Sequence, residues 1–181
     1  MKRYFFWIFA GLTLGWMTVI FLLSAQSIAQ SQETSGGITL FLAELFYGKG
    51  ITITEDMMEP VTLLVRKTAH MAAYAVLFLL SYGTVYYYKN SLAEKWSRLV
   101  AYGWTVFYAV TDEIHQIFSG RGAMVTDVFV DALGALIGIL LLCAFVKKNK
   151  LKRKVIALFG AAGVYVLAFL LFYPQVIKIF L

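Results

Sequence analysis

The sequence predicts an all-α fold, an integral membrane bundle of five transmembrane helices, and two observations carry this prediction. Hydrophobic residues make up 61% of the 181 residues and charged residues only 14%, against about 25% in a typical soluble domain. A soluble protein of this size has too little interior to bury so many apolar side chains. Five stretches also approach the roughly 20 apolar residues that an α-helix needs to cross a bilayer.

The five predicted spans form one domain that covers residues 1–181. The apolar run of the first span is longer than the core of a signal peptide, so we expect it to be retained. Two pairs of glycines, Gly11 with Gly15 and Gly134 with Gly138, have the GxxxG spacing of closely packed membrane helices. The predicted spans are residues 4–23, 66–88, 99–118, 124–146 and 155–173.

Basic residues gather in the connections at one end of this bundle, which indicates how it lies in the membrane. The positive-inside rule makes that end cytoplasmic. We therefore expect the N-terminus inside and the C-terminus outside, and we attribute the net charge of +6 to topology rather than to a nucleic-acid partner. Eleven of the sixteen Lys and Arg residues lie at this end: Lys2, Arg3, Lys89, Lys95, Arg98, Lys147, Lys148, Lys150, Lys152, Arg153 and Lys154.

The connection between the first two spans, residues 24–60, is long and acidic and lies outside in this orientation. Within it, residues 38–47 (ITLFLAELFY) are mostly apolar but too short to span the membrane. They fit a short interfacial or re-entrant helix over the outer mouth of the bundle, or a helix packed within the loop. The connection at 119–123 is so short that the third and fourth spans should be antiparallel neighbours.

Polar side chains of four spans are predicted to share one depth near the outer surface, because successive spans run in opposite directions. At about 1.5 Å per residue, His70, Asp112 and Asp131 fall within about 10 Å of that surface. Charged residues inside a membrane normally face a bundle interior or a water-filled cavity. We therefore expect a polar pocket that opens to the outer leaflet, lined by Ser24, Gln26, Arg66, Lys67, His70, Tyr74, Asp112, Glu113, His115, Gln116, Asp127 and Asp131.

Helical spacing indicates which of these residues share a face. Arg66, His70 and Tyr74 follow one another at intervals of four in the second span. In the third span, Asp112, His115 and Gln116 share a face, from which we expect Glu113 to turn away.

Some of these residues also have purely structural explanations. Arg66 and Lys67 could extend to the interface, Glu113 could pair with one of them, and Asp127 suits the first turn of a helix. Neither depth nor the helix dipole explains Asp112, His115 and Asp131 together.

The polar blocks, in this order, resemble the VanZ family. The matching pieces are SAQS at 24–27, RKTAHMAAY at 66–74, DEIHQIFSGR at 112–121 and DVFVDALGALIG at 127–138. The resemblance covers roughly residues 4–146, and it brings Arg121 into the expected site. One departure is Asp131, where we expect Asn in many members; this adds a negative charge to the pocket.

The resemblance implies a small bacterial protein of the cytoplasmic membrane. The namesake of the family confers low-level resistance to teicoplanin-type glycopeptide antibiotics without altering the peptidoglycan termini. Resistance need not be the role of this protein, because many members occur away from resistance clusters.

Three functions of different classes fit the predicted pocket. The first is binding or modification of an envelope lipid or a lipid-linked precursor, with Arg66, Lys67 and Arg121 at its phosphate or carboxylate. The second is an enzyme acting on a lipid phosphate, in which His115 with Asp112 is the base and His70 the acid, or in which a divalent ion assists. The third, a small transporter working as a dimer, is disfavoured because the sequence has no inverted repeat. We expect the first function, with no cofactor and no metal; the oligomeric state stays open.

Overall fold

The computed structural model describes residues 2–48, 50, 52–88, 94–118, 124–145 and 151–173. In this part of the chain the predicted all-α fold is confirmed: the regular elements are helices and none of the described residues lies in a strand. The helices are α1 (Lys2–Ser24), α2 (Ile28–Tyr47), α3 (Glu55–Tyr88), α4 (Glu94–Phe118), α5 (Val125–Phe145) and α6 (Leu151–Phe172).

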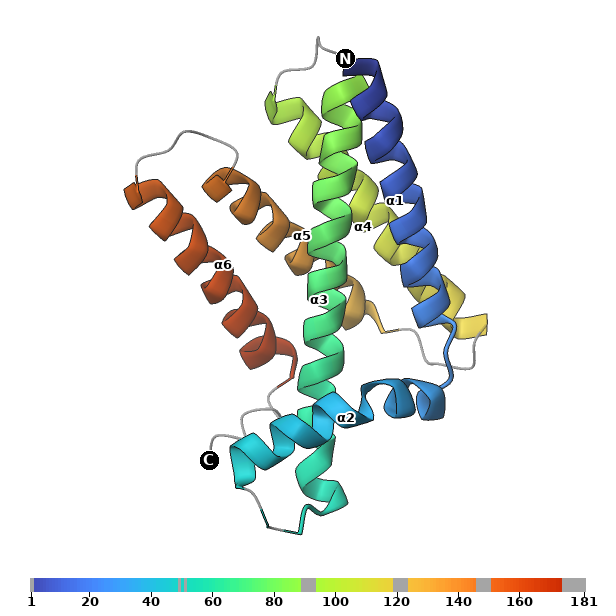
Figure 1. Cartoon of the computed structure of the whole chain (residues 1–181), viewed down its shortest axis with the longest axis vertical. Helices are drawn as coiled ribbons and strands as arrows, with labels where there is room; N and C mark the ends of the chain where they lie inside the picture. The colour runs from blue at the N-terminus through green and yellow to red at the C-terminus, as the bar shows by residue number, and fades with distance from the viewer. Residues whose placement is uncertain are drawn as a thin grey trace.

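The long helix α3 lies at the centre of the molecule. It packs against α1, α2, α4 and α5, while α6 packs mainly against α5. Helix α2 crosses the others near one end of the molecule, and the N-terminus lies at the opposite end (Figure 1). The bulkiest fully buried side chains, Met71, Tyr74, Leu77 and Phe78, all belong to α3, so this helix supplies the largest side chains of the apolar core.

Among the described residues, four helical segments are long and apolar enough to cross a membrane: Arg3–Ser24, Glu55–Tyr88, Val125–Phe145 and Lys154–Phe172. Helices of this length and composition fit a multi-pass membrane protein. Helix α4, which corresponds to the predicted third span, is less apolar than these four because charged residues lie near both of its ends. Its polar side chains nevertheless point inward, and the side chains that it exposes are largely apolar, among them Leu99, Val100, Trp104, Phe107, Val110, Ile114 and Ile117.

The predicted connection at 24–60 is more ordered than we expected. Helix α2 is a 20-residue helix rather than a short segment at 38–47. Its start is stabilised by a capping box, in which the Ser27 side chain accepts from the Gln30 N–H and the Gln30 side chain accepts from the Ser27 N–H. It ends at Gly48, whose φ of 103° places it in the region that favours glycine.

Helix α3 also begins earlier than predicted, at Glu55 rather than at residue 66. Acidic residues in the first turn suit the positive end of its dipole. Its 34 residues extend about 51 Å at 1.5 Å per residue. Because this exceeds the roughly 30 Å of a hydrocarbon core, part of α3 must project beyond it.

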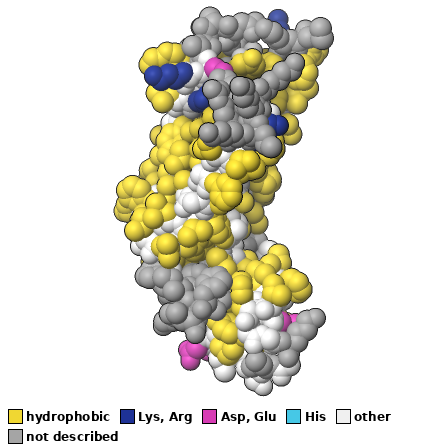
Figure 2. Space-filling model, turned by 90° about the vertical axis from the view of Figure 1, so that its left-hand side faces the viewer, with side chains coloured by type: hydrophobic (Ala, Val, Ile, Leu, Met, Phe, Trp, Pro, Cys, Tyr) yellow, Lys and Arg dark blue, Asp and Glu magenta, His cyan; other side chains and the backbone are white. Residues whose placement is uncertain are grey.

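Charged side chains separate toward the two ends of the molecule. Figure 2 shows visible Lys and Arg side chains toward the end where α1 begins, with a largely hydrophobic band below them. Arg3, Lys95, Arg98 and Lys154 belong to helix ends on that side. Lys89, Lys147, Lys148 and Lys150, which we also predicted there, lie outside the described residues.

Close packing of α3 on α5 depends on the second glycine pair. A Cβ on Gly138 would lie 2.8 Å from the Ala75 carbonyl oxygen, and a Cβ on Gly134 would overlap the Met71 backbone. The expectation of close packing is confirmed for these two glycines. It is wrong for Gly11 and Gly15, where a Cβ would meet nothing within 4 Å.

Replacing Gly134 with Ala should therefore push α3 and α5 apart. We expect Gly134→Ala to lower the free energy of unfolding by about 1–3 kcal/mol, the usual cost of overpacking. Thermal unfolding of the purified protein in detergent measures the effect. The control is Gly103→Ala in α4, where a Cβ meets nothing within 4 Å and should stabilise the helix by up to about 1 kcal/mol. Shifts of the same sign in both variants would contradict this account of the packing.

Candidate functional site

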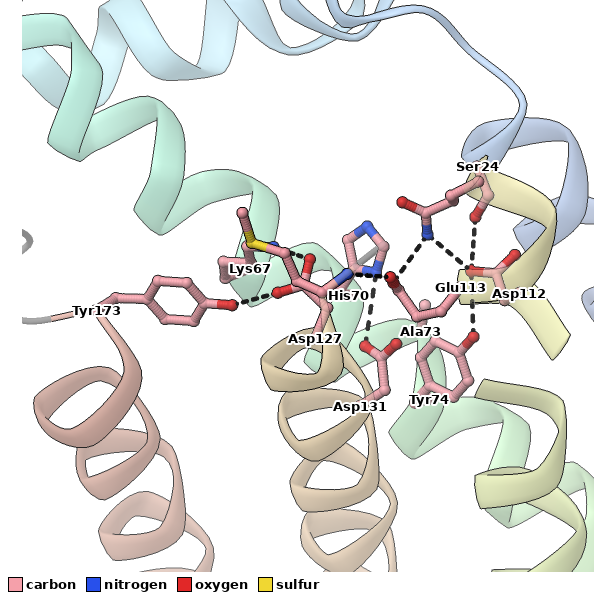
Figure 3. A network of polar contacts seen from close by, with 12 residues as sticks. Ser24, Lys67, His70, Ala73, Tyr74, Asp112, Glu113, Asp127, Asp131 and Tyr173 are labelled. Carbon is pink, nitrogen blue, oxygen red and sulfur yellow. Dashed lines mark hydrogen bonds and ion pairs between the residues drawn. The ribbon is translucent and has the colours of Figure 1, made fainter. Parts of the chain in front are cut away.

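The predicted polar residues gather at the end of the bundle where α2 lies. Figure 3 shows three groups of polar contacts there, formed by side chains from α1, α3, α4 and α5 and by Tyr173 just beyond α6. The groups centre on the carboxylates of Asp112, Asp131 and Asp127. The four helices meet here because each brings its short polar stretch to the same depth, as the sequence predicted.

Asp112 of α4 is the acceptor that links three helices. Its carboxylate is 2% exposed, and its Oδ2 atom accepts hydrogen bonds from the Ser24 hydroxyl (2.8 Å), the Tyr74 hydroxyl (3.3 Å) and the Gln116 amide (3.3 Å). Burying a charge is costly unless donors compensate for the lost water. Its other oxygen, Oδ1, has no hydrogen-bond partner among the described residues.

Glu113 is buried beside Asp112, so the expectation that it turns away from the shared face is wrong. Its Oε1 accepts from the Gln116 amide at 3.0 Å, and its Oε2 accepts from the Met124 backbone N–H at 3.1 Å. Residues 113 and 116 are three apart, a spacing that places them on one side of the helix. Glu113 therefore ties the end of α4 to the start of α5. It does not supply the suggested ion pair with Lys67, which binds Asp127 instead.

The second group is an ion pair between His70 and Asp131. His70 Nδ1 lies 3.5 Å from Asp131 Oδ1, and Asp131 is 1% exposed. Within the described residues neither oxygen of Asp131 has a hydrogen-bond partner, so His70 is the cationic group placed to compensate it. The other nitrogen of the His70 ring points away from Asp131, on the side where α2 lies (Figure 3).

The third group clamps α3, α5 and the end of α6. The Lys67 ammonium lies 2.5 Å from Asp127 Oδ2, and the Tyr173 hydroxyl donates to Asp127 Oδ1 at 2.6 Å. The ammonium also lies 5.2 Å from the centre of the Tyr173 ring, within cation–π range. Asp127 also occupies the first turn of α5, where a carboxylate suits the positive end of the helix dipole. Sequence reasoning missed Tyr173, which is the last residue of the predicted span 155–173 and lies outside the region of the family resemblance.

The ring of His115 stacks on Phe21 of α1, with 4.0 Å between the ring centres. Asp112 accepts from Ser24, Tyr74 and Gln116, and the suggested role of His115 as a base with Asp112 stays a prediction. His70 lies beside another carboxylate, that of Asp131. Arg121, the last predicted site residue, lies outside the described residues.

A cavity of about 260 Å³ lies between α1, α2 and α3; we call it the α2 cavity. The described lining residues include one free cation: Arg66 has no hydrogen bond or ion pair with any described residue, whereas neighbouring Lys67 is paired. The polar lining is Ser24, Gln26, Ser31, Thr34, Ser35, Arg66, His70 and Tyr74, and the apolar lining is Ile20, Leu23, Ile38, Val65, Ala69 and Ala73.

Three of the lining residues, Ser31, Thr34 and Ser35, were missed by sequence reasoning. They lie in the first half of α2, in the stretch that we took for a loop. The signal that could have found them is the capping pair Ser27 and Gln30, which predicts a helix start. Spacings of three and four then put the three hydroxyls on one helix face.

The metal-assisted alternative finds no donor set in the part of the chain that the structure describes. No group of three or more His, Cys, Asp or Glu side chains there could hold a metal ion. The predicted residues are instead divided between separate contacts: Asp131 with His70, and Asp127 with Lys67.

The hydrogen bond from Ser24 should be the strongest of the three that hold Asp112, because it is the shortest. We expect Ser24→Ala to lower the free energy of unfolding by about 1.5–3 kcal/mol, the range for a hydrogen bond to a charged group. Thermal unfolding in detergent measures it. The control is Thr18→Ala in the same helix, whose exposed hydroxyl bonds only the Leu14 carbonyl and whose loss should cost less than about 0.5 kcal/mol. Equal losses in the two variants would show that Asp112 does not depend on Ser24.

Comparison with known proteins gives one match. A family model described as VanZ/LLP1 matches residues 9–147. The matched region reaches from α1 to the end of α5 and contains every residue of the three polar groups except Tyr173. No curated protein and no solved structure matches the chain.

Proposed function

Because the chain belongs to the VanZ/LLP1 family and carries a free arginine in a cavity, we propose that it binds the anionic headgroup of an envelope lipid or a lipid-linked precursor. The α2 cavity is the binding site. The observation that carries this proposal is Arg66, a half-buried guanidinium that lines the cavity without a partner among the described residues. An arginine in such a place suits a phosphate or carboxylate, either of which it can bind with two hydrogen bonds.

The proposed site lies in the outer leaflet of the bacterial cytoplasmic membrane. Its depth follows from five spans, with α4 as the third. Helix α4 buries polar side chains and exposes apolar ones, the arrangement expected when the surroundings are lipid. The basic end of the molecule is then cytoplasmic by the positive-inside rule, so the N-terminus lies inside, the C-terminus outside and the α2 cavity near the outer surface.

Helix α2 is proposed to lie along the outer membrane interface. Its second half exposes large apolar side chains, including Ile38, Phe41 and Leu45, which are at least 60% exposed. Its first half contributes hydroxyl groups to the cavity. The helix thus offers polar groups to the cavity and apolar side chains to surrounding lipid, as suits the boundary between lipid and water. In this position α2 covers the cavity from the aqueous side.

The cavity is the right size for a headgroup and too small for an antibiotic. Its volume of about 260 Å³ falls below the range of about 300–1,000 Å³ that is usual for drug-sized ligands. The apolar lining from α1 and α3 lets the lipid tail leave toward the membrane. Lower susceptibility to teicoplanin-type glycopeptides would then follow from an altered envelope lipid rather than from capture of the drug.

An enzyme acting on a lipid phosphate is the second candidate, and His70 favours it. This side chain lines the cavity and is paired with the buried Asp131, an arrangement that orients an imidazole for proton transfer. Arg66 would hold the phosphate during such a step. Formation of a product from the lipid that co-purifies would favour this candidate over simple binding.

The proposed topology predicts which positions a membrane-impermeant maleimide reaches in intact cells. Cys143 is the sole cysteine of the chain, so single cysteines can be placed in a Cys143→Ser background. We expect Glu59→Cys, exposed at the start of α3, to be labelled. Lys95→Cys, exposed at the start of α4, should be labelled only after the cells are opened. The reverse pattern would invert the orientation, and labelling of both in intact cells would remove α3, the helix between the two positions, from the list of spans.

The proposed binding predicts that the purified protein retains an anionic lipid through Arg66. Native mass spectrometry in mild detergent should detect this lipid on the wild type. Arg66→Gln should reduce its occupancy at least about tenfold, the effect of one charge-assisted contact. The control, Lys95→Gln, removes the same charge from the opposite end of the molecule and should retain the lipid. Equal retention by both variants would rule out Arg66 as the binding residue, and no lipid on the wild type would contradict the proposed function.

A further inference from the structure

We infer that the ligand of the α2 cavity is a lipid phosphodiester with an uncharged polyol headgroup, and that Asp131 sets this specificity. The inference rests on the proposed function and names its ligand class. It follows from the charges around the cavity, from the residues that line it and from its size.

One uncompensated positive charge faces the cavity among the described residues. Lys67, next in sequence to Arg66, is neutralised by Asp127 at 2.5 Å. His70 lines the cavity, but the buried Asp131 lies 3.5 Å from its ring, so the two groups together carry no net charge. Asp112 lies nearby and is held by three neutral donors, so no cation neutralises it and it adds negative charge beside the cavity. Arg66 is left as the free cation among the described lining residues, which favours a ligand with no more than a single negative charge.

The positions of Arg66 and His70 allow both to contact one phosphate. They are four residues apart on α3, so their Cβ atoms lie about 5–6 Å apart on the same helix face. Both line the α2 cavity. The guanidinium can bind the charged oxygens of a phosphodiester, and the outer nitrogen of His70 can approach an ester oxygen of the same group.

The remaining polar lining selects the group beyond the phosphate. Ser31, Thr34 and Ser35 of α2 present hydroxyls, and Gln26 presents an amide. These groups can hydrogen-bond a glycerol or sugar hydroxyl. No Asp or Glu is among the described lining residues, so an ammonium headgroup would find no carboxylate partner. The lining therefore suits a polyol headgroup better than a zwitterionic one.

Asp131 explains why a more highly charged lipid is rejected. A pyrophosphate-linked lipid carries at least two negative charges and would need a second free cation. Asp131 neutralises His70, so His70 supplies no second free cation for such a lipid.

The experiment compares three lipids on the purified full-length protein by competitive native mass spectrometry at about pH 6, where an imidazole is largely protonated in water. The probes are dioleoyl phosphatidylglycerol, dioleoyl phosphatidylethanolamine and farnesyl pyrophosphate. We expect phosphatidylglycerol to bind the wild type at least about tenfold more tightly than either competitor, as loss of one charged hydrogen-bond partner would produce. Glycerophosphoglycerol, a soluble diester without lipid tails, is tested as a further competitor. If it competes, the lipid tail is not needed for binding.

The decisive variant is Asp131→Asn, which keeps the shape of the side chain and removes its negative charge, so that a bound anion can take the place of the carboxylate as the counter-ion of His70. We expect it to shift the ratio of farnesyl pyrophosphate to phosphatidylglycerol by about tenfold in favour of the pyrophosphate. The matched control is Glu33→Gln, the same chemical change at an exposed position of α2, which should leave the ratio unchanged. Thermal unfolding of the variant establishes that it is folded. If Asp131→Asn does not fold, Asp131→Ser removes the same charge with a smaller side chain, and the same shift toward the pyrophosphate is expected; an unchanged ratio in the folded serine variant would equally remove Asp131 as the specificity residue.

The outcomes separate this inference from the proposed function. If no anionic lipid binds the wild type, the proposed function itself fails. If phosphatidylglycerol and farnesyl pyrophosphate bind the wild type equally, binding stands and the charge limit is wrong. A preference for phosphatidylethanolamine would overturn the assignment of the headgroup. An unchanged ratio in folded Asp131→Asn would remove Asp131 as the specificity residue.

Discussion

Burial of carboxylates among apolar helices is the constraint on which the arrangement of this protein depends. Asp112, Glu113 and Asp131 are all nearly inaccessible, and a buried charge is tolerated only where donors or cations replace water. Those partners come from other helices: Ser24 from α1, Tyr74 and His70 from α3, and the Met124 backbone at the start of α5. The contacts between these partners and the buried acids therefore connect four helices at the end of the molecule where α2 lies.

The pairing of cations with acids also determines which charges remain at the α2 cavity. Nearly every cation at this end is used to neutralise an acid, as Lys67 is by Asp127. Arg66 is the exception among the described residues, and it lines the cavity of about 260 Å³ between α1, α2 and α3. In the proposed function, stability and binding are coupled, because the ion pairs that connect the helices also determine how much charge remains for a ligand.

Helix α3 carries polar residues of the candidate site and also packs closely against α5. Its lower half carries Arg66, Lys67, His70 and Tyr74 on the polar side, and its middle packs closely on α5 through Gly134 and Gly138. A small residue on one helix lets the backbones approach, and the approach brings Asp131, three residues before Gly134, within reach of His70. Helix α6 lies largely outside the matched family region, yet Tyr165 and Tyr173 bind Thr68 and Asp127 and brace this arrangement.

The sequence by itself determined the helical fold, the membrane character and the end at which the polar residues meet. Apolar runs of sufficient length define helices, and alternating chain direction brings residues such as His70 and Asp131 to one depth. Local spacing could not give the pairings, because these depend on how each helix is rotated about its axis. Only the tertiary structure decided that Asp112 accepts from Ser24, that Glu113 faces inward and that α2 lines a cavity. Each of these outcomes is set by contacts between residues far apart in the chain, and such contacts leave no periodic signal in the sequence.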